Sequence, residues 1–384
     1  MEKQMNIPQL RFPEFNGEWE KKKLGEVVKI NQGLQIDISE RFTEKVEGSY
    51  FYITNQFLKA NSDRTYFIKN PPNSVLCTKE DILMTRTGNT GMVVTNVEGA
   101  FHNNFFKVAY PDYVSKNFLY NFLKLENTQN QILRMAGTST IPDLNHSDFY
   151  RIFFYFPTLP EQTKIATFLT AVDEKLQALK KKKSLLVDYK KGVMQKLFSQ
   201  DLRFKDENGK DFADWEEKKL GEVCEIKKGV QLNKEELTEL GSYPCLNGGI
   251  NFSGYTEKFN SEENTITISE GGNSCGYINF MTSKFWLGGH CYKIILSSKI
   301  NTGYFYQLLK FYEKKIMDLR VGSGLPNIQQ KDIRNFNLEF CNSLQEQTLI
   351  ASFLSAIDQK INHNQTQITQ TETWKKGLLQ KMFV

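Results

Sequence analysis

Two charged stretches of this 384-residue chain have a spacing that could serve phosphodiester cleavage. Glu20-Lys21-Lys22 and Glu216-Glu217-Lys218 each place a carboxylate two positions before a lysine, as at the end of a metal-dependent nuclease motif. Such a site also needs an upstream aspartate to hold the metal ion, and neither stretch has one in position. The pattern therefore favours a solvated charged face.

Asn70-Pro71-Pro72-Asn73 is similar to the Asn-Pro-Pro-aromatic motif of adenine-N6 methyltransferases. In that motif the aromatic ring stacks on a base that has been flipped out of the duplex. Asn73 has no ring to stack, and no glycine-rich strand-to-helix turn precedes it to hold a methyl donor. We therefore predict a surface turn.

The other chemistry-bearing residue types form no catalytic constellation. There is no GxxxxGK[ST] motif for an ATP-driven motor, and the six cysteines and four histidines lack the clustering of a zinc site. We expect reduced cysteines in a cytoplasmic protein, and no catalytic residue, cofactor or metal in this chain. Two glycine loops, Gly88-Asn89-Thr90-Gly91 and Gly271-Gly272-Asn273-Ser274, could cradle a phosphate through backbone N–H groups.

The composition is that of a soluble protein with more than one domain. A chain of this length exceeds one ordinary core, and it has neither an eighteen-residue apolar run nor a signal-peptide start, so no membrane segment is expected. The net charge of +5 divides into +1, +5, −2 and +1 for residues 1–158, 159–200, 201–340 and 341–384. Nucleic-acid binding would therefore depend on local patches or on a partner's charge.

The sequence elements that would position such loops occur twice. PEQTKIATFLTAVDEKL (160–176) returns as QEQTLIASFLSAIDQKI (345–361), with ten of seventeen positions identical. A second repeat opens each half, where LRFPEFNGEWEKKKLGEVVKINQG (10–33) corresponds to LRFKDENGKDFADWEEKKLGEVCEIKKG (202–229). The chain thus consists of two variable halves, each followed by a related tail.

The tails have the apolar periodicity of long helices, with steps of three and four residues. The apolar positions that we single out are Ile165, Phe168, Leu169, Val172, Leu176 and Leu179 in the first tail, and Ile350, Phe353, Leu354, Ile357 and Ile361 in the second. We predict two helices of about 40 residues, or roughly 60 Å, that pair as an antiparallel coiled coil within one chain. Dimerisation between chains is the alternative. Asn364 replaces Leu179 in the second seam, where a polar residue costs stability but can fix the register.

The variable halves have the pattern of a mixed α/β (α+β) fold. Strand-like runs and helical patches are separated by glycine- and asparagine-rich turns; the strands are expected at 49–55, 81–86, 104–110, 264–269 and 291–296, and the helices at 116–135 and 302–319. We predict tandem globular domains at 1–158 and 201–342, separated by spacer helices at 159–200 and 343–384.

These repeats resemble the specificity subunit of type I restriction-modification enzymes over essentially the whole chain. The resemblance rests on the PEQ…IA.FL…D.K tail, the following KKG..QK(L/M)F, and the W…KLGEV motif, each present twice. It implies two target recognition domains that each read one half of a split sequence in double-stranded DNA, at a distance set by the coiled coil. It also implies a non-catalytic chain that binds two methyltransferase and two restriction/translocase subunits, to which S-adenosylmethionine, ATP and Mg belong.

Polar loop residues are the expected base readers, because their side chains match the donors and acceptors on base edges. In the first domain these are Gln35, Arg86, Asn89, Thr90, Asn103, Thr138, Ser139 and Thr140; in the second they are Gln231, Asn233, Asn273, Ser274, His290 and Ser323. For each residue the alternative is a role in stabilising a turn.

Two other functions would account for only part of this sequence. A coiled-coil adaptor without DNA recognition would explain the tails but not two α/β domains that diverge in their middles. A self-contained methyltransferase would need the cofactor loop that this sequence lacks.

Overall fold

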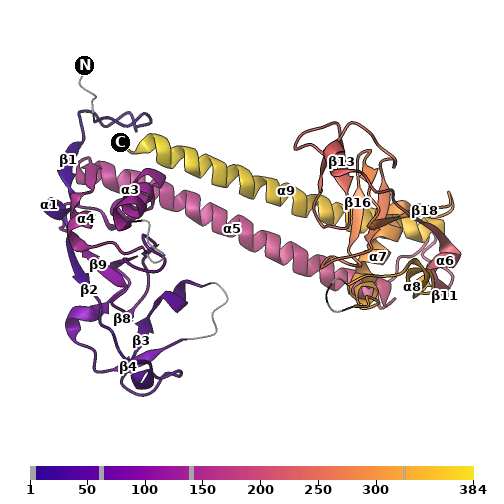
Figure 1. The fold of residues 1–384 in the computed structure, drawn as a ribbon, viewed down its shortest axis with the longest axis horizontal. Helices are drawn as coiled ribbons and strands as arrows, with labels where there is room; N and C mark the ends of the chain where they lie inside the picture. Colours follow the sequence, from indigo (N-terminus) through magenta and orange to yellow (C-terminus); the bar gives the residue numbers. More distant parts are fainter. Residues whose placement is uncertain (1–5, 60–64, 138–141, 323, 325) are drawn as a thin grey trace. The chain divides into compact units, whose positions relative to one another are not determined.

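The computed structural model of the chain describes residues 6–59, 65–137, 142–322, 324 and 326–384. The chain divides into two compact units: unit 1 is Met1–Leu179 with Gln367–Val384, and unit 2 is Lys180–Thr366. Two long helices, α5 (Leu159–Phe198) and α9 (Leu344–Met382), each contribute one stretch to each unit (Figure 1). The predicted helical tails are confirmed.

The described residues of unit 1 form two four-stranded sheets and one strand pair. The first sheet is antiparallel and has the order β2 (Lys29–Gln32), β9 (Phe105–Ala109), β6 (Ile82–Thr85), β7 (Val93–Val94). The second is mixed and has the order β4 (Phe67–Lys69), β3 (Ser49–Ile53), β8 (Gly99–Phe101), β5 (Leu76–Cys77). Strand β1 (Glu20–Lys23) pairs with β10 (Phe153–Phe156).

The central strand β6 is buried on both faces because helices and the second sheet cover it. Ile82 and Met84 lie in the main core with residues of the helices, whereas Leu83 between them lies in a smaller core with residues of the second sheet. This is the alternation that a strand imposes on successive side chains. The helical elements are α1 (Leu24–Val27), α2 (Lys116–Lys124), α3 (Glu126–Ala136) and α4 (His146–Arg151), with short 3₁₀ turns η1 (Ile38–Glu40), η2 (Asn55–Leu58) and η3 (Asn73–Val75).

Where the structure describes it, unit 2 repeats this plan with one strand fewer in its second sheet. The first sheet has the order β12 (Cys224–Lys228), β18 (Cys291–Leu296), β15 (Thr265–Ser269), β16 (Ile278–Met281), and the second β14 (Gly254–Thr256), β13 (Tyr243–Leu246), β17 (Trp286–Leu287). Strand β11 (Glu216–Lys219) pairs with β19 (Asn337–Phe340). The helical elements are α6 (Leu220–Val223), α7 (Thr302–Met317), α8 (Gln330–Arg334) and the 3₁₀ turn η4 (Lys234–Glu236).

The predicted mixed α/β class is confirmed, as are the five strand-like runs and both helical patches. The patch at 116–135 forms two helices, because the extended backbone of Leu125 ends α2 and begins α3. The turn at Asn70–Asn73 is also confirmed: Asn70 has a φ of 49°, Asn73 opens η3, and both side chains are exposed. The Glu-x-Lys stretches form the mostly exposed strands β1 and β11.

The described part of the chain lacks two kinds of feature. None of its helices is long and apolar enough to cross a membrane. Within the same ranges, no three His, Cys, Asp or Glu side chains are grouped so that they could hold a metal ion.

Candidate nucleic-acid interface

A buried glutamate at the start of α5 holds the first half of the chain to this helix. The carboxylate of Glu161, which is 2% exposed, accepts two hydrogen bonds from Arg11, at 2.8 and 2.7 Å, and one from the indole N–H of Trp19 at 3.4 Å. The next residue, Gln162, accepts from the backbone N–H of Ser115 at 2.8 Å, just before α2. The Glu-Gln pair of the repeated phrase is therefore an anchor for its own domain.

The start of α9 makes the same contacts in unit 2. Glu346, which is 1% exposed, accepts from Arg203 at 3.2 and 3.1 Å and from the indole N–H of Trp215 at 3.1 Å. Gln347 accepts from the backbone N–H of Asn301 at 2.8 Å, just before α7. Both domains are thus held to the start of a long helix by equivalent hydrogen bonds, which explains why the Glu-Gln sequence at the start of α5 is repeated at the start of α9.

The stretches of α5 and α9 in unit 2 run antiparallel. Lys190 lies 2.7 Å from Asp358, and Lys183 donates to Gln365 at 2.7 Å. Lys190 lies seven residues after Lys183 on α5, whereas Asp358 lies seven residues before Gln365 on α9. This heptad spacing is typical of a coiled coil.

Unit 1 repeats the ion pair with the helices exchanged. Asp173 of α5 pairs with Lys375 of α9. Asp173 lies 185 residues before Asp358, and Lys375 lies 185 residues after Lys190, so both residues of this pair are at repeat-equivalent positions. Of the spacer residues predicted from sequence, the structure buries Ile165, Leu169, Val172, Ile350, Leu354 and Ile357, and half-buries Phe168, Leu176, Leu179, Phe353 and Ile361.

The loop after β6 begins at Arg86, whose backbone is fixed on both sides. Its N–H donates to the carbonyl of Asn104 at 2.7 Å, and its own carbonyl accepts from Leu144 at 2.9 Å. The guanidinium donates to Asp143 at 2.6 Å and lies 5.7 Å from the centre of the Phe106 ring. Arg86 is therefore held at the end of the central strand β6, with its charge balanced by a carboxylate.

Glu270 has the same place in unit 2. Its N–H donates to the carbonyl of His290 at 2.9 Å, and its carbonyl accepts from Ile328 at 2.9 Å. Its carboxylate accepts from Lys228 at 2.6 Å and from the hydroxyl of Tyr292 at 2.7 Å. Burial and the contact with Glu270 raise the pKa of Tyr292 well above its usual range, so the hydroxyl remains a donor. The two units thus place opposite charges at one backbone position.

The loop that follows β6 (residues 86–92) and the loop that follows β15 (residues 270–277) are called the strand-end loops. Both contain glycines whose backbone is in the left-handed region. Gly88 and Gly91 have φ values of 86° and 89°, and Gly272 and Gly276 have values of 76° and 86°. A residue with a Cβ atom would be strained at any of these positions. The loops therefore share a backbone plan although their side chains differ.

Several predicted readers form hydrogen bonds with other groups of the protein. The Thr90 hydroxyl donates to the Pro142 carbonyl at 2.6 Å, and the Ser274 hydroxyl donates to the Gly248 carbonyl at 2.7 Å. The amide of Asn103 donates to that of Gln35 at 2.9 Å. These contacts would brace the loops in the absence of any ligand.

The predicted readers differ in how exposed their side chains are. The side chains of Gln35, Asn89, Gln231, Asn233, Asn273 and His290 are exposed, whereas Arg86, Asn103 and Ser274 are half-buried and Thr90 is buried. Thr138, Ser139, Thr140 and Ser323 lie outside the described residues. Base reading by each of these residues stays a prediction.

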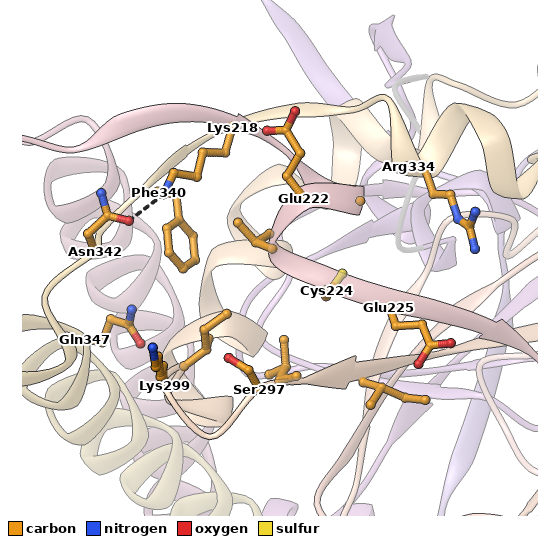
Figure 2. Close-up of a pocket in the computed structure, with 15 residues that line it drawn as sticks. Lys218, Glu222, Cys224, Glu225, Ser297, Lys299, Arg334, Phe340, Asn342 and Gln347 are labelled. Carbon is orange, nitrogen blue, oxygen red and sulfur yellow. Dashed lines mark hydrogen bonds between the residues drawn. The ribbon is translucent and has the colours of Figure 1, made fainter.

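Two hollows open on unit 2. One of about 450 Å³ lies at the strand-end loops and is lined by Asn247, Gly248, Gly271, Gly272, Ser274, His290, Pro326 and Asn327. The other, of about 790 Å³, adjoins the anchored start of α9; Figure 2 shows Lys218 at its wall, donating to Asn342. Two of the predicted readers, Ser274 and His290, line the first hollow. The predicted readers did not include Asn247, Lys228 or Glu270, although an alignment of the two glycine loops places Glu270 opposite Arg86.

Comparison with known proteins agrees with this architecture. A sequence model described as the type I restriction modification DNA specificity domain matches residues 16–187 and 213–372. A Mycoplasma pneumoniae protein named "Putative type I specificity subunit S.MpnORF638P" is 38% identical over 153 residues, which span 39% of this chain and only 40% of that relative. The MjaVIII type I restriction enzyme specificity subunit of Methanocaldococcus jannaschii is 25% identical over 401 residues, covering 96% of this chain and 92% of the relative.

A solved structure shares the whole fold. The type I restriction-modification S subunit from M. genitalium matches with a TM-score of 0.69 and 23% identity, covering 98% of this chain and 99% of that one. Because the family model matches most of the sequence in two segments, one in each half, the chain belongs to the type I restriction-modification DNA specificity family, whose standard role is recognition of a DNA sequence.

Proposed function

We propose that this chain reads a DNA sequence in two separate parts, with unit 1 reading one half-sequence and unit 2 the other. The observation that carries this proposal is the contrast between a repeated frame and unlike loop residues. The anchors, the helix ion pairs and the glycine turns are duplicated, whereas Arg86 in one strand-end loop is replaced by Glu270 in the other. A protein that needed two copies of one binding site would not invert the charge there.

The readers on each unit are loop side chains at the strand ends. Arginine suits the guanine acceptors, and asparagine suits adenine, because each can make two parallel hydrogen bonds to the base edge. The overall charge of the chain, +5, supplies little general attraction for phosphate. Phosphate contacts and much of the affinity are therefore expected to come from partner subunits.

Those partners are two methyltransferase subunits and two restriction/translocase subunits, which would use S-adenosylmethionine, ATP and Mg. In this proposal the chain itself performs no catalysis. It determines where the partners act, and its helix pair α5–α9 sets the gap between the half-sequences.

The test is selection of bound duplexes from random-sequence DNA, carried out with the chain alone and with its methyltransferase partner. The complex should enrich two short half-sequences separated by a fixed gap. A complex that retains no sequence preference would support the adaptor function instead. Methyl transfer by the isolated chain would contradict the proposed division of labour.

A further inference from the structure

Each strand-end loop has a cation beside it, but the two cations come from different positions in the fold. In unit 1 it is Arg86, which directly follows β6, and in unit 2 it is Lys228, the last residue of β12. In unit 1, Gln32 pairs with Phe106 in the sheet register, and in unit 2 Lys228 pairs with Tyr292. Phe106 and Tyr292 are themselves equivalent, since each faces the last but one residue of its central strand, Met84 in β6 and Ile268 in β15. Lys228 therefore stands where unit 1 has an uncharged glutamine.

Lys228 is exposed and yet held by a buried group. Its side chain is 52% exposed, but its ammonium lies 2.6 Å from Glu270, whose side chain is only 7% exposed. Glu270 is itself fixed by the Tyr292 hydroxyl, at 2.7 Å, and has His290 Nδ1 at 4.0 Å from its second oxygen. A flexible lysine normally samples many rotamers, so this contact gives its ammonium a defined direction.

This arrangement leaves donors available for a ligand. An ammonium has three N–H donors, and among the described residues Glu270 is the acceptor that Lys228 contacts. Lys228 lies at the same end of the strands as His290, since Lys228 ends β12 and His290 directly precedes the neighbouring strand β18. His290 lines the 450 Å³ hollow with Ser274 and Asn247. The ligand would meet Lys228 next to the residues already expected to read bases.

The balanced charge indicates which part of DNA Lys228 would contact. A lysine that binds phosphate contributes mainly net positive charge and the release of counterions. Lys228 forms a pair of zero net charge with Glu270, so its contribution is a directed hydrogen bond rather than a field. Arg86 is balanced by Asp143 in the same way. Directed donors suit the acceptors on guanine, which lysine and arginine contact most often.

We propose that Lys228 is a base-reading residue of unit 2 that donates to a guanine acceptor, and that Glu270 is its positioning residue. This inference rests on the proposed function and names one contact within it. Glu270 is equivalent to Arg86 in backbone position but acts through Lys228, so unit 2 supplies its cation from β12 rather than from the end of the central strand.

The test compares matched variants in the complex with the methyltransferase partner. Lys228→Gln installs the residue that unit 1 has at the equivalent position. Lys227→Gln is the control, because Lys227 is 53% exposed and pairs with Glu225, which is also exposed. The readouts are the methylated sequence motif, the affinity for motif and random duplexes, and the dependence of that affinity on salt concentration.

Lys228→Gln should lose about ten-fold or more of the discrimination at one guanine position of one half-sequence. The other half-sequence and the salt dependence should be unchanged, and Lys227→Gln should keep the full motif. Glu270→Gln should release an unbalanced cation, so binding to random duplexes should strengthen and the salt slope should steepen by about one.

Two results would overturn the inference. In one, Lys228→Gln leaves the motif intact. In the other, it weakens all duplexes equally and lowers the salt slope by about one, which identifies a phosphate contact. If the wild-type complex shows no motif that depends on this chain, the proposed function fails, and the inference fails with it.

Discussion

Phe383 lies edge-on to Trp19 in unit 1, with ring centroids 6.2 Å apart. Phe198 makes the equivalent contact with Trp215 in unit 2, at 6.1 Å. Phe383 directly follows α9, which begins in unit 2 and ends in unit 1. Phe198 is the last residue of α5, which begins in unit 1 and ends in unit 2. The core of each unit therefore contains a phenylalanine from the end of the helix that begins in the other unit. Both rings are buried.

The backbone follows the same relationship. The N–H of Leu10 donates to the carbonyl of Lys381 at 2.8 Å, and the N–H of Leu202 donates to that of Lys196 at 3.0 Å. In unit 2 the paired segments are neighbours in the chain, whereas in unit 1 they come from its opposite ends. Unit 1 therefore depends on residues far apart in the sequence.

Phe383→Ala should destabilise unit 1 by about 3–5 kcal/mol, because it empties a site in the core that is lined by Trp19 and Phe118. Hydrogen exchange should show lost protection in unit 1. Val384→Ala is the control, since Val384 is exposed. Equal loss of protection in both units would contradict this assignment.

Asn364→Leu should stabilise unit 2 by about 1–3 kcal/mol. Asn364 is 1% exposed, and neither its amide nitrogen nor its oxygen has a hydrogen-bond partner among the described residues, which is costly in an apolar seam. Denaturant unfolding of the variant would measure the change. The reciprocal change at the equivalent position, Leu179→Asn, should destabilise unit 1. A less stable Asn364→Leu variant would show that the amide has a role besides fixing the register.

Unit 1 should lose stability as the pH falls from about 6.5 to about 4. Burial, with a smaller effect of Arg41, lowers the pKa of His102 to about 4. Between these pH values the unfolded chain binds a proton that the folded chain does not, so stability falls by on the order of 2–3 kcal/mol.

His102→Asn should remove this part of the pH dependence, as measured by thermal unfolding at pH 7 and pH 4.5. The control is His363→Asn on the exposed side of α9. If both variants retain the wild-type pH dependence, another group is responsible.

The gap between half-sequences should follow the length of the helix pair. Four residues inserted into α5 after Leu179 add about one turn, or roughly 6 Å. Because α9 also contributes to both units, it needs a matching insertion after Thr366. DNA rises about 3.4 Å per base pair, so the gap should lengthen by one or two base pairs with both half-sequences unchanged. An active complex with an unaltered gap would exclude this role for the helices.

Sequence patterns were sufficient for the frame of the molecule and insufficient for its loops. Apolar steps of three and four predicted α5 and α9, and short β-rich runs predicted the central strands β6 and β15, because burial imposes those periods. The Gln35–Asn103 hydrogen bond joins residues 68 positions apart, which no local pattern encodes. Lys228 looked like one more charged residue of a strand, and only its contact with the buried Glu270 distinguishes it from Lys227.

The central claim is that the two units read their half-sequences independently. The most direct measurement exchanges residues 34–136 for the equivalent segment of another family member and maps the adenines that the complex methylates. The account predicts that one half-sequence changes to that of the donor, while the other half-sequence and the gap are retained. A change in both half-sequences, or in neither, would contradict it.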